Sequence, residues 1–210
     1  GRVQYIILAY ILTGFILFGY PFILIWVGEN FVNAYYMALI IMIPITVPLI
    51  QNIGLSILQG MNLQGFRSIV LIMISMANIS ISIPLAKIYG GIGVAIGTGV
   101  SYVVGNGIIM NIYYHRRIGI NILKFWKNIF LMSVPVVLSL LLGYGINYFV
   151  PQNNLLFLMF KIGLFSIIYF ILMWLLAFTD FAKGLVRPII GEIKKVAHKF
   201  SKTKKKSSSN

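Results

Sequence analysis

The stretch that decides the fold is YGGIGVAIGTGVSYVVGNGIIM, residues 89–110, which places seven glycines among Ile, Val, Ala and Met. In water, a glycine inside a helix costs about 1 kcal/mol relative to alanine, so this stretch is a poor helix for a soluble protein. It is nevertheless too apolar and too long for a loop. A lipid bilayer is the setting in which closely spaced small residues help helices to pack.

The composition of the whole chain points to the same setting. Of its 210 residues, 60% are hydrophobic and only 10% are charged. Apolar runs of about 20 residues recur along it, which is the length that crosses a hydrocarbon core of about 30 Å. They do not alternate apolar and polar residues as the strands of a membrane β-barrel do. We therefore predict an all-α polytopic membrane protein with six transmembrane helices, at 5–27, 34–59, 68–86, 92–114, 128–149 and 155–179.

The charges predict how the chain is oriented. Segments 28–33 and 150–154 hold no Lys or Arg, whereas the alternate segments are basic. The basic residues of those segments are Arg67, Arg116, Arg117, Lys124 and Lys127. By the positive-inside rule, these segments and both ends of the chain face the cytoplasm. The formal net charge of +14 then reflects topology, and we do not expect a nucleic-acid partner.

Small residues in 89–110 recur at helical spacing. Gly93, Gly97, Ser101 and Gly105 follow one another every four residues and so form one stripe along a helix. A second stripe beside it comprises Gly91, Ala95, Gly99 and Gly107. Such stripes let two helix backbones approach closely in a bilayer, which predicts a tight helix–helix contact. A surface that slides during transport fits the same pattern, and the sequence does not separate the two.

Prolines within the apolar runs predict bent helices. A proline removes one backbone donor and crowds the preceding turn, so a kink is expected at each. Pro44 and Pro48 lie one turn apart, which makes 34–59 the helix expected to be broken or to flex. The other prolines of this kind are Pro21, Pro84 and Pro135.

Several polar residues lie within the predicted spans, where they are costly unless they face protein or water. They are Asn52, Ser56, Gln59, Asn78, Thr98, Asn106 and Asn111. One interpretation is a hydrophilic cavity whose amides and hydroxyls bind sugar hydroxyls. The other is that they join helices through hydrogen bonds, and both remain open.

Lys161 is the one basic residue well inside a predicted span. It either snorkels to the surface or helps to hold a phosphate. The acidic residues Glu29, Asp180 and Glu192 all lie outside the apolar cores, so these spans offer no carboxylate for proton or sodium coupling. With no cysteine, no phosphate-binding loop and no partnered histidine, we expect neither an enzyme nor a metal or cofactor site.

The C-terminal part differs from the rest. Residues 181–200 place their apolar side chains on one helical face, which predicts an amphipathic helix lying on the membrane surface. Residues 201–210, SKTKKKSSSN, predict a disordered basic tail drawn to anionic lipid.

Three stretches carry a resemblance to a known family. They are GFILFGYPFILIWVGENFVNAYYMALIIMIP (14–44), LSILQGMNLQGFRS (55–68) and SIPLAKIYGGIGVAIGTGVSYVV (82–104). In this order they resemble the C-terminal half of the polysaccharide flippases, lipid-linked oligosaccharide exporters of the MATE-like superfamily of bacteria and archaea. The third stretch is the most specific, because a span ends in a proline and a short Lys-containing turn leads to Tyr-Gly-x-x-Gly-x-Ala-x-x-Thr. The resemblance covers about residues 1–180.

The resemblance implies that residues 1–180 form one six-helix lobe of a transporter in the cytoplasmic membrane. Its activity would be translocation of undecaprenyl-diphosphate-linked repeat units by alternating access, for O-antigen, capsule or exopolysaccharide synthesis. Implied partners are the lipid-linked glycan, membrane lipids, an N-terminal lobe or second subunit, and a polysaccharide polymerase or glycosyltransferases. The candidates for attracting the diphosphate are Arg67, Arg116, Arg117 and Lys161.

Two alternatives remain. One is a multidrug or cation antiporter of the same superfamily, against which the lack of acidic residues in the spans argues. The other is a membrane subunit that does not transport and instead scaffolds a glycan-assembly complex.

Overall fold

The computed structural model describes residues 2–149 and 154–178, and the observations below concern these residues. The amphipathic helix predicted at 181–200 and the basic tail at 201–210 lie outside them. The chain divides into two compact units, Gly1–Tyr169 and Phe170–Asn210. The contacts and cavities discussed below belong to the first unit.

The described residues are helical, with no strand among them. In chain order the elements are α1 (Arg2–Trp26), η1 (Glu29–Phe31), α2 (Val32–Ile50), α3 (Asn52–Gly60), α4 (Gln64–Tyr102), η2 (Val103–Ile109), α5 (Met110–Arg117), α6 (Ile122–Phe149), α7 (Leu155–Leu172) and η3 (Met173–Phe178). Six stretches are long and apolar enough to cross a membrane: Arg2–Trp26, Glu29–Ile50, Gln64–Tyr89, Gly91–Arg117, Ile122–Tyr148 and Leu155–Leu176. The prediction of an all-α chain with six such helices is confirmed.

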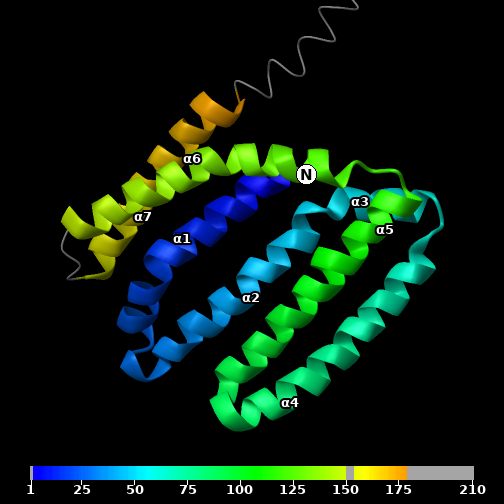
Figure 1. Cartoon of the computed structure of the whole chain (residues 1–210). Helices are drawn as coiled ribbons and strands as arrows, with labels where there is room; N and C mark the ends of the chain where they lie inside the picture. Colours follow the sequence, from blue (N-terminus) through cyan, green and yellow to red (C-terminus); the bar gives the residue numbers. More distant parts are fainter. Residues whose placement is uncertain (1, 150–153, 179–210) are drawn as a thin grey trace, which may run out of the picture. The chain divides into compact units, whose positions relative to one another are not determined.

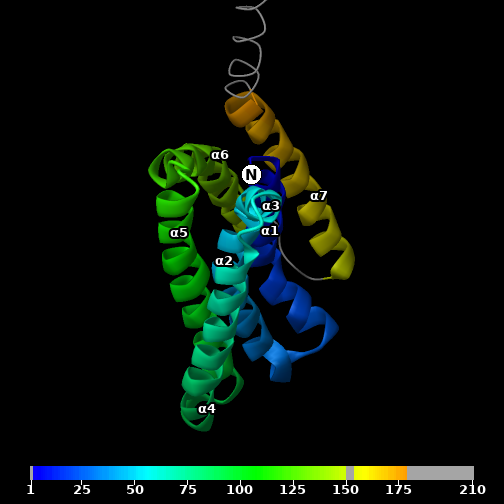
Figure 2. The ribbon, with the colours of Figure 1, turned by 90° about the vertical axis from the view of Figure 1, so that its right-hand side faces the viewer.

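Helix α2 links two groups of helices within the first unit. On one side it packs against α1, which in turn packs against α6. On the other side it packs against α4 and the π-helix η2 that leads into α5. Figures 1 and 2 show α2 between α1 and α5 in both views.

Helix α4 is two antiparallel spans joined at Gly90. This residue has φ 59° and ψ −136°, a backbone conformation that is essentially restricted to glycine. The chain therefore reverses within the sequence Tyr-Gly-Gly, and the span that begins at Gly91 returns along the one that ends at Tyr89. The glycines that follow then face the preceding span at close range.

The two small-residue stripes face two different neighbours. A Cβ atom at Gly93 or Gly97 would collide with the backbone at Leu85 or with Ser82, both on the preceding span. In the same stripe, a Cβ at Gly105 would collide with Ile74. The second stripe faces α2, since a Cβ at Gly91 would lie 2.7 Å from the Met37 sulfur and one at Gly99 would lie 3.0 Å from the Ile40 carbonyl oxygen. The span at 91–117 thus approaches two neighbours closely, the preceding span on one side and α2 on the other.

The contact at Gly99 follows from a proline. Pro44 has no N–H, so it leaves the carbonyl of Ile40 without its usual partner within the helix. The Gly99 backbone lies against this carbonyl and against the Pro44 ring, whose Cγ would be 3.5 Å from a Cβ at Gly99. Helix α2 nevertheless runs unbroken through Pro44 and Pro48, and α6 runs unbroken through Pro135.

The predicted span 34–59 is broken, as expected, but the break lies after Pro48, so the C-terminal end predicted for this span is wrong. Helix α2 ends at Ile50, and residues 52–60 form the separate helix α3. The break lies at Gln51 (φ −86°, ψ 10°), whose side-chain amide donates to Asn111 Oδ1 at 2.5 Å and so binds the break to α5. Helix α3 ends at Gly60, and Asn62, in the hairpin that leads to α4, has a left-handed backbone with φ 55°.

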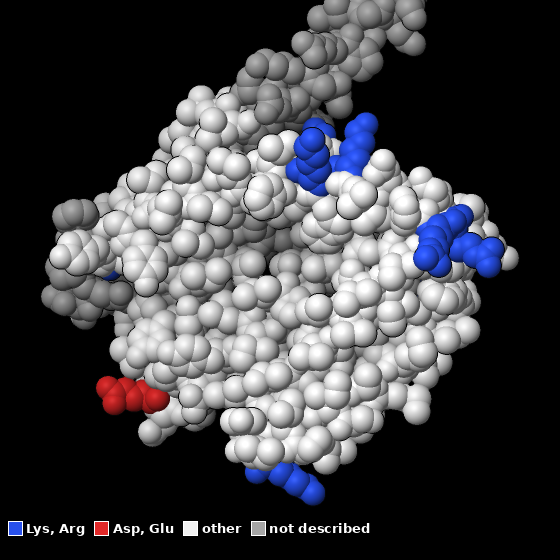
Figure 3. Space-filling model, in the orientation of Figure 1, with Lys and Arg blue, Asp and Glu red and all other residues white. Residues whose placement is uncertain are grey.

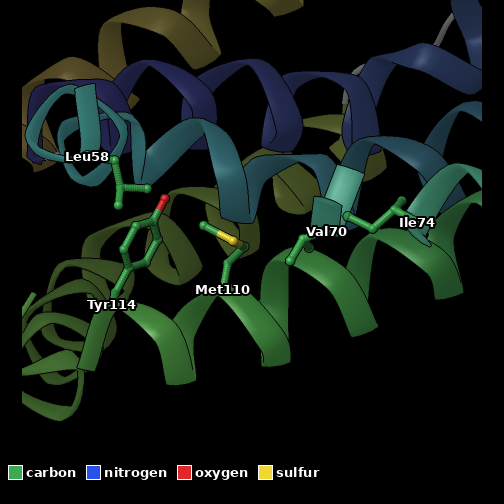
Figure 4. Packing of buried hydrophobic residues seen from close by; sticks show 5 residues of the cluster. All are labelled: Leu58, Val70, Ile74, Met110 and Tyr114. Atoms are coloured by element: carbon green, nitrogen blue, oxygen red, sulfur yellow. The ribbon is translucent and has the colours of Figure 1, made fainter. Parts of the chain in front are cut away.

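A cluster of buried apolar residues joins α3, α4 and α5. Its members are Leu58, Val70, Ile74, Met110 and Tyr114. Figure 4 shows these side chains pointing toward one another from the three helices. The cluster fixes the α3–α4 hairpin against the end of the 91–117 span.

Candidate functional site

Hydrogen bonds between side chains and neighbouring helices tie α1 to α6 and α7. The hydroxyls of Tyr5 and Ser133 lie 2.5 Å apart, those of Tyr10 and Ser166 lie 2.6 Å apart, and the Tyr169 hydroxyl donates to the Ile6 carbonyl at 2.8 Å. A bilayer provides no hydrophobic force between helices, so such directional links and close packing specify which helices pair. They hold α6 and α7 against α1.

A proline in α1 creates the centre of the site. Pro21 has no N–H, and so the carbonyl of Leu17 lacks its usual donor within the helix. Asn147 on α6 replaces that donor, because its Nδ2 donates to the Leu17 oxygen at 3.0 Å. The other end of the same amide, Oδ1, accepts a hydrogen bond from the Lys161 ammonium at 3.3 Å. The proline thus determines how Asn147 presents its oxygen to Lys161.

Lys161 is completely buried, with 0% of its surface exposed. No carboxylate balances its charge within the described residues, where the one acidic residue is the exposed Glu29. The interpretation that Lys161 snorkels to the surface is therefore wrong. The ammonium instead donates to Asn147 inside the protein.

A cavity of about 530 Å³ lies beside this pair, between α1, α2 and α6. Asn147 lines it together with three tyrosines, Tyr20, Tyr35 and Tyr144. The Tyr35 hydroxyl donates to the Ile16 carbonyl at 2.9 Å, and its ring packs edge-on against that of Tyr20. The cavity therefore presents aromatic faces, hydroxyls and one amide, next to a buried positive charge.

This arrangement suits a ligand with both sugar and phosphate. Tyrosine and asparagine side chains offer apolar faces together with hydrogen-bonding groups. An ammonium binds phosphate as a point charge, and such charge-assisted bonds are about twice as strong as neutral ones. The site lies toward the ends of α1 and α6 that are far from the basic loops.

The structure separates the polar residues predicted to line one cavity. Asn78 and Thr98 meet across the α4 hairpin, where Asn78 Oδ1 accepts from Thr98 at 3.2 Å and from Ser82 at 2.6 Å. Asn111 accepts from Gln51 and, at 3.4 Å, from Trp126. These groups therefore join helices.

The remaining polar candidates lie elsewhere. Asn106 is buried in η2, and its Nδ2 has no hydrogen-bond partner among the described residues. Asn52, Ser56 and Gln59 are exposed on α3, outside the second span. None of the seven predicted residues lines the tyrosine cavity.

The sequence analysis missed Asn147 and the three tyrosines. Residues 128–149 look almost continuously apolar, and a single amide near their end carries no pattern. The available signal was Pro21, because a carbonyl freed within a membrane must find a donor on another helix. That requirement does not identify the donor, which sequence alone leaves among many residues.

The predicted diphosphate cations do not gather at one place. Arg67 lies near the start of α4 and is half-buried, whereas Arg116 and Arg117 are exposed at the end of α5. Lys161 lies toward the other end of the spans. Figure 3 shows basic side chains at the edges of this face and an uncharged surface between them. The role of the three arginines stays a prediction.

Comparisons with protein-family models, with curated proteins and with solved structures find no match for this chain. The buried Lys161, its Asn147 partner and the adjoining cavity are therefore the basis for assigning a function.

Proposed function

We propose that this chain is a transmembrane lobe of a transporter for lipid-linked glycans, which moves undecaprenyl-diphosphate-linked oligosaccharides across the cytoplasmic membrane by alternating access. The observation that carries the proposal is Lys161, a fully buried cation in a membrane-spanning helix, whose acceptor among the described residues is the Asn147 amide. It lies next to a cavity lined by tyrosines.

The energetics of Lys161 favour an anionic ligand. An unpaired charge inside a protein costs several kcal/mol after relaxation, and charges inside membrane segments mark substrate pathways. One amide oxygen satisfies one of the three ammonium donors. A phosphate oxygen entering from the cavity past Asn147 supplies both further acceptors and the missing negative charge.

The remaining features of the proposal concern the class of substrate. The described spans contain no carboxylate in their interior, since Glu29 is the exposed first residue of its span, and this disfavours a cation antiporter, whose substrate is positively charged. The tyrosine-lined cavity is large enough for a sugar residue and offers it hydroxyl and amide partners. The resemblance of residues 14–44, 55–68 and 82–104 to the polysaccharide flippases supports the same class.

A binding experiment tests the role of Lys161. The Lys161→Met variant is expected to bind a fluorescent undecaprenyl-diphosphate oligosaccharide about 10- to 100-fold more weakly than the unchanged chain, because it loses charge-assisted hydrogen bonds of about 1.5–3 kcal/mol. The matched control is Lys87→Met, which removes an exposed lysine from the turn of α4 and leaves affinity unchanged. A ligand with the same sugars on an uncharged polyprenyl ether is expected to bind both variants alike.

The alternatives give different results. Equal binding of the charged ligand by both variants contradicts the assignment of Lys161. Reconstitution in vesicles then separates a transporter from a scaffold, because a scaffold binds the lipid-linked glycan without moving it between leaflets. Binding of cationic drugs that improves in Lys161→Met favours the antiporter.

A further inference from the structure

A second cavity lies at the opposite end of the spans from the tyrosine cavity. It measures about 220 Å³ and is lined by residues of α2, α3, α5 and α6 and of the loop before α6. Its apolar lining includes Ile50, Ile57, Ile120, Ile122 and Phe125. Nothing in the function proposed above uses this pocket.

Two features keep the pocket apolar and open. Gln51 is the one lining side chain with an amide, and its Nε2 donates to Asn111 Oδ1 on α5. Gly54 lets α3 approach the ring of Tyr114, because a Cβ on this glycine would lie only 3.2 Å from the ring. The pocket is therefore a built part of the fold where α3 crosses α5.

Three basic residues lie next to lining residues of the pocket in the chain. Arg116 and Arg117 lie between two lining residues, Tyr114 and Ile120, and both are exposed. Lys124 lies between the lining residues Ile122 and Phe125 and is also exposed. We call Arg116, Arg117 and Lys124 the basic rim of the pocket.

We propose that this pocket binds an acyl chain of an anionic phospholipid, with the headgroup phosphate held by the basic rim. Charge complementarity argues for this occupant: basic pockets between membrane helices bind anionic headgroups, whereas a neutral lipid leaves the cations without partners. The apolar lining takes a chain and not a sugar. A lipid bound there contacts both α3 and the start of α6, which line the pocket.

Native mass spectrometry of the full 210-residue chain in detergent tests the proposal. The probes are phosphatidylglycerol and phosphatidylcholine with identical acyl chains. The unchanged protein is expected to prefer phosphatidylglycerol. In the double variant Arg116→Gln/Arg117→Gln, the affinity for phosphatidylglycerol is expected to fall about fivefold for each cation removed. Lys87→Gln, at the other end of the spans, is the matched control and retains the preference.

A second variant tests the pocket itself. Ile57→Phe fills it from an exposed position and is expected to weaken phosphatidylglycerol binding, whereas Ile72→Phe, on the exposed surface of α4, leaves it unchanged. The nine Lys and Arg after residue 180 are common to every variant, so their contribution cancels.

Three results overturn the proposal. The first is equal affinity for the two phospholipids, and the second is an Ile57→Phe variant that binds phosphatidylglycerol as well as Ile72→Phe does. The third is displacement of phosphatidylglycerol by undecaprenyl phosphate at equal concentration, which assigns the pocket to the prenyl tail of a substrate. Lys161→Met is expected to leave phosphatidylglycerol binding unchanged, so a failure of the proposed function does not change this outcome.

Discussion

Replacing Lys161 with methionine is expected to stabilise the ligand-free protein, whereas replacing Asn147 with leucine is expected to destabilise it. In Lys161→Met the cost of burying an unbalanced charge, several kcal/mol, disappears, while one hydrogen bond to Asn147 is lost. The net change is a gain in the free energy of unfolding on the order of 1 kcal/mol. A ligand that needs Lys161 then stabilises the unchanged chain and not the variant.

The loss in Asn147→Leu has two parts. The Leu17 carbonyl, freed by Pro21, loses its donor, and a buried polar group without a partner costs about 1–3 kcal/mol. The Lys161 ammonium loses its acceptor, which adds about 1.5–3 kcal/mol because the group is charged. The sum is a destabilisation of about 4 kcal/mol.

A double-mutant cycle isolates the second part. When Lys161 is already methionine, Asn147→Leu costs only the carbonyl term, so the coupling between the two positions is about 2 kcal/mol. Reversible unfolding in mixed micelles with increasing dodecyl sulfate measures all four free energies. Additive effects of the two substitutions refute the pairing of Lys161 with Asn147. Destabilisation by Lys161→Met refutes the claim that its charge is unbalanced.

Two further predictions concern glycine packing and the proline. Gly97→Leu is expected to lower the Tm and to cost about 1–3 kcal/mol, because its side chain overpacks the α4 hairpin. The control is Gly145→Leu, which has little effect because a Cβ at this position meets nothing within 4 Å. Equal Tm values for the two variants contradict the close contact of the stripe at Gly97. Pro21→Ala restores a donor within α1 for the Leu17 carbonyl. In that background, Asn147→Leu is expected to lower the free energy of unfolding by about 1–3 kcal/mol less than it does in the unchanged chain. If the same dodecyl sulfate titration finds an unchanged loss, the proline does not direct the Asn147 amide.

The helices were predictable because length and hydropathy are local properties. A run that crosses a bilayer needs about 20 apolar residues, and each of the six runs is read directly from the chain. The stripe at Gly93 and Gly97 is equally local, since helical periodicity places these residues on one face. The neighbour that each stripe faces depends on the turn at Gly90 and was not predictable.

The candidate site was harder to predict because it depends on contacts between distant residues. Lys161 was identified by its charge, but its direction depends on Asn147, 14 residues earlier, and on Pro21 in another helix. The polar residues with a visible pattern, such as Asn52 and Ser56, lie outside the cavity. The break at Gln51, after the end of α2, likewise involves a bond to Asn111, 60 residues away, which no local pattern predicts.

The hydrogen bonds of α1 have a consequence for how the chain is made. This helix is the first of the six in chain order, yet its partners Ser133, Asn147, Ser166 and Tyr169 follow it by 128 to 163 residues. During synthesis, the Tyr5 and Tyr10 hydroxyls and the Leu17 carbonyl of α1 have no partners on α6 and α7 until these two helices have been made. A chain interrupted after α5 therefore exposes these polar groups to lipid, and they stay exposed until α6 and α7 are inserted.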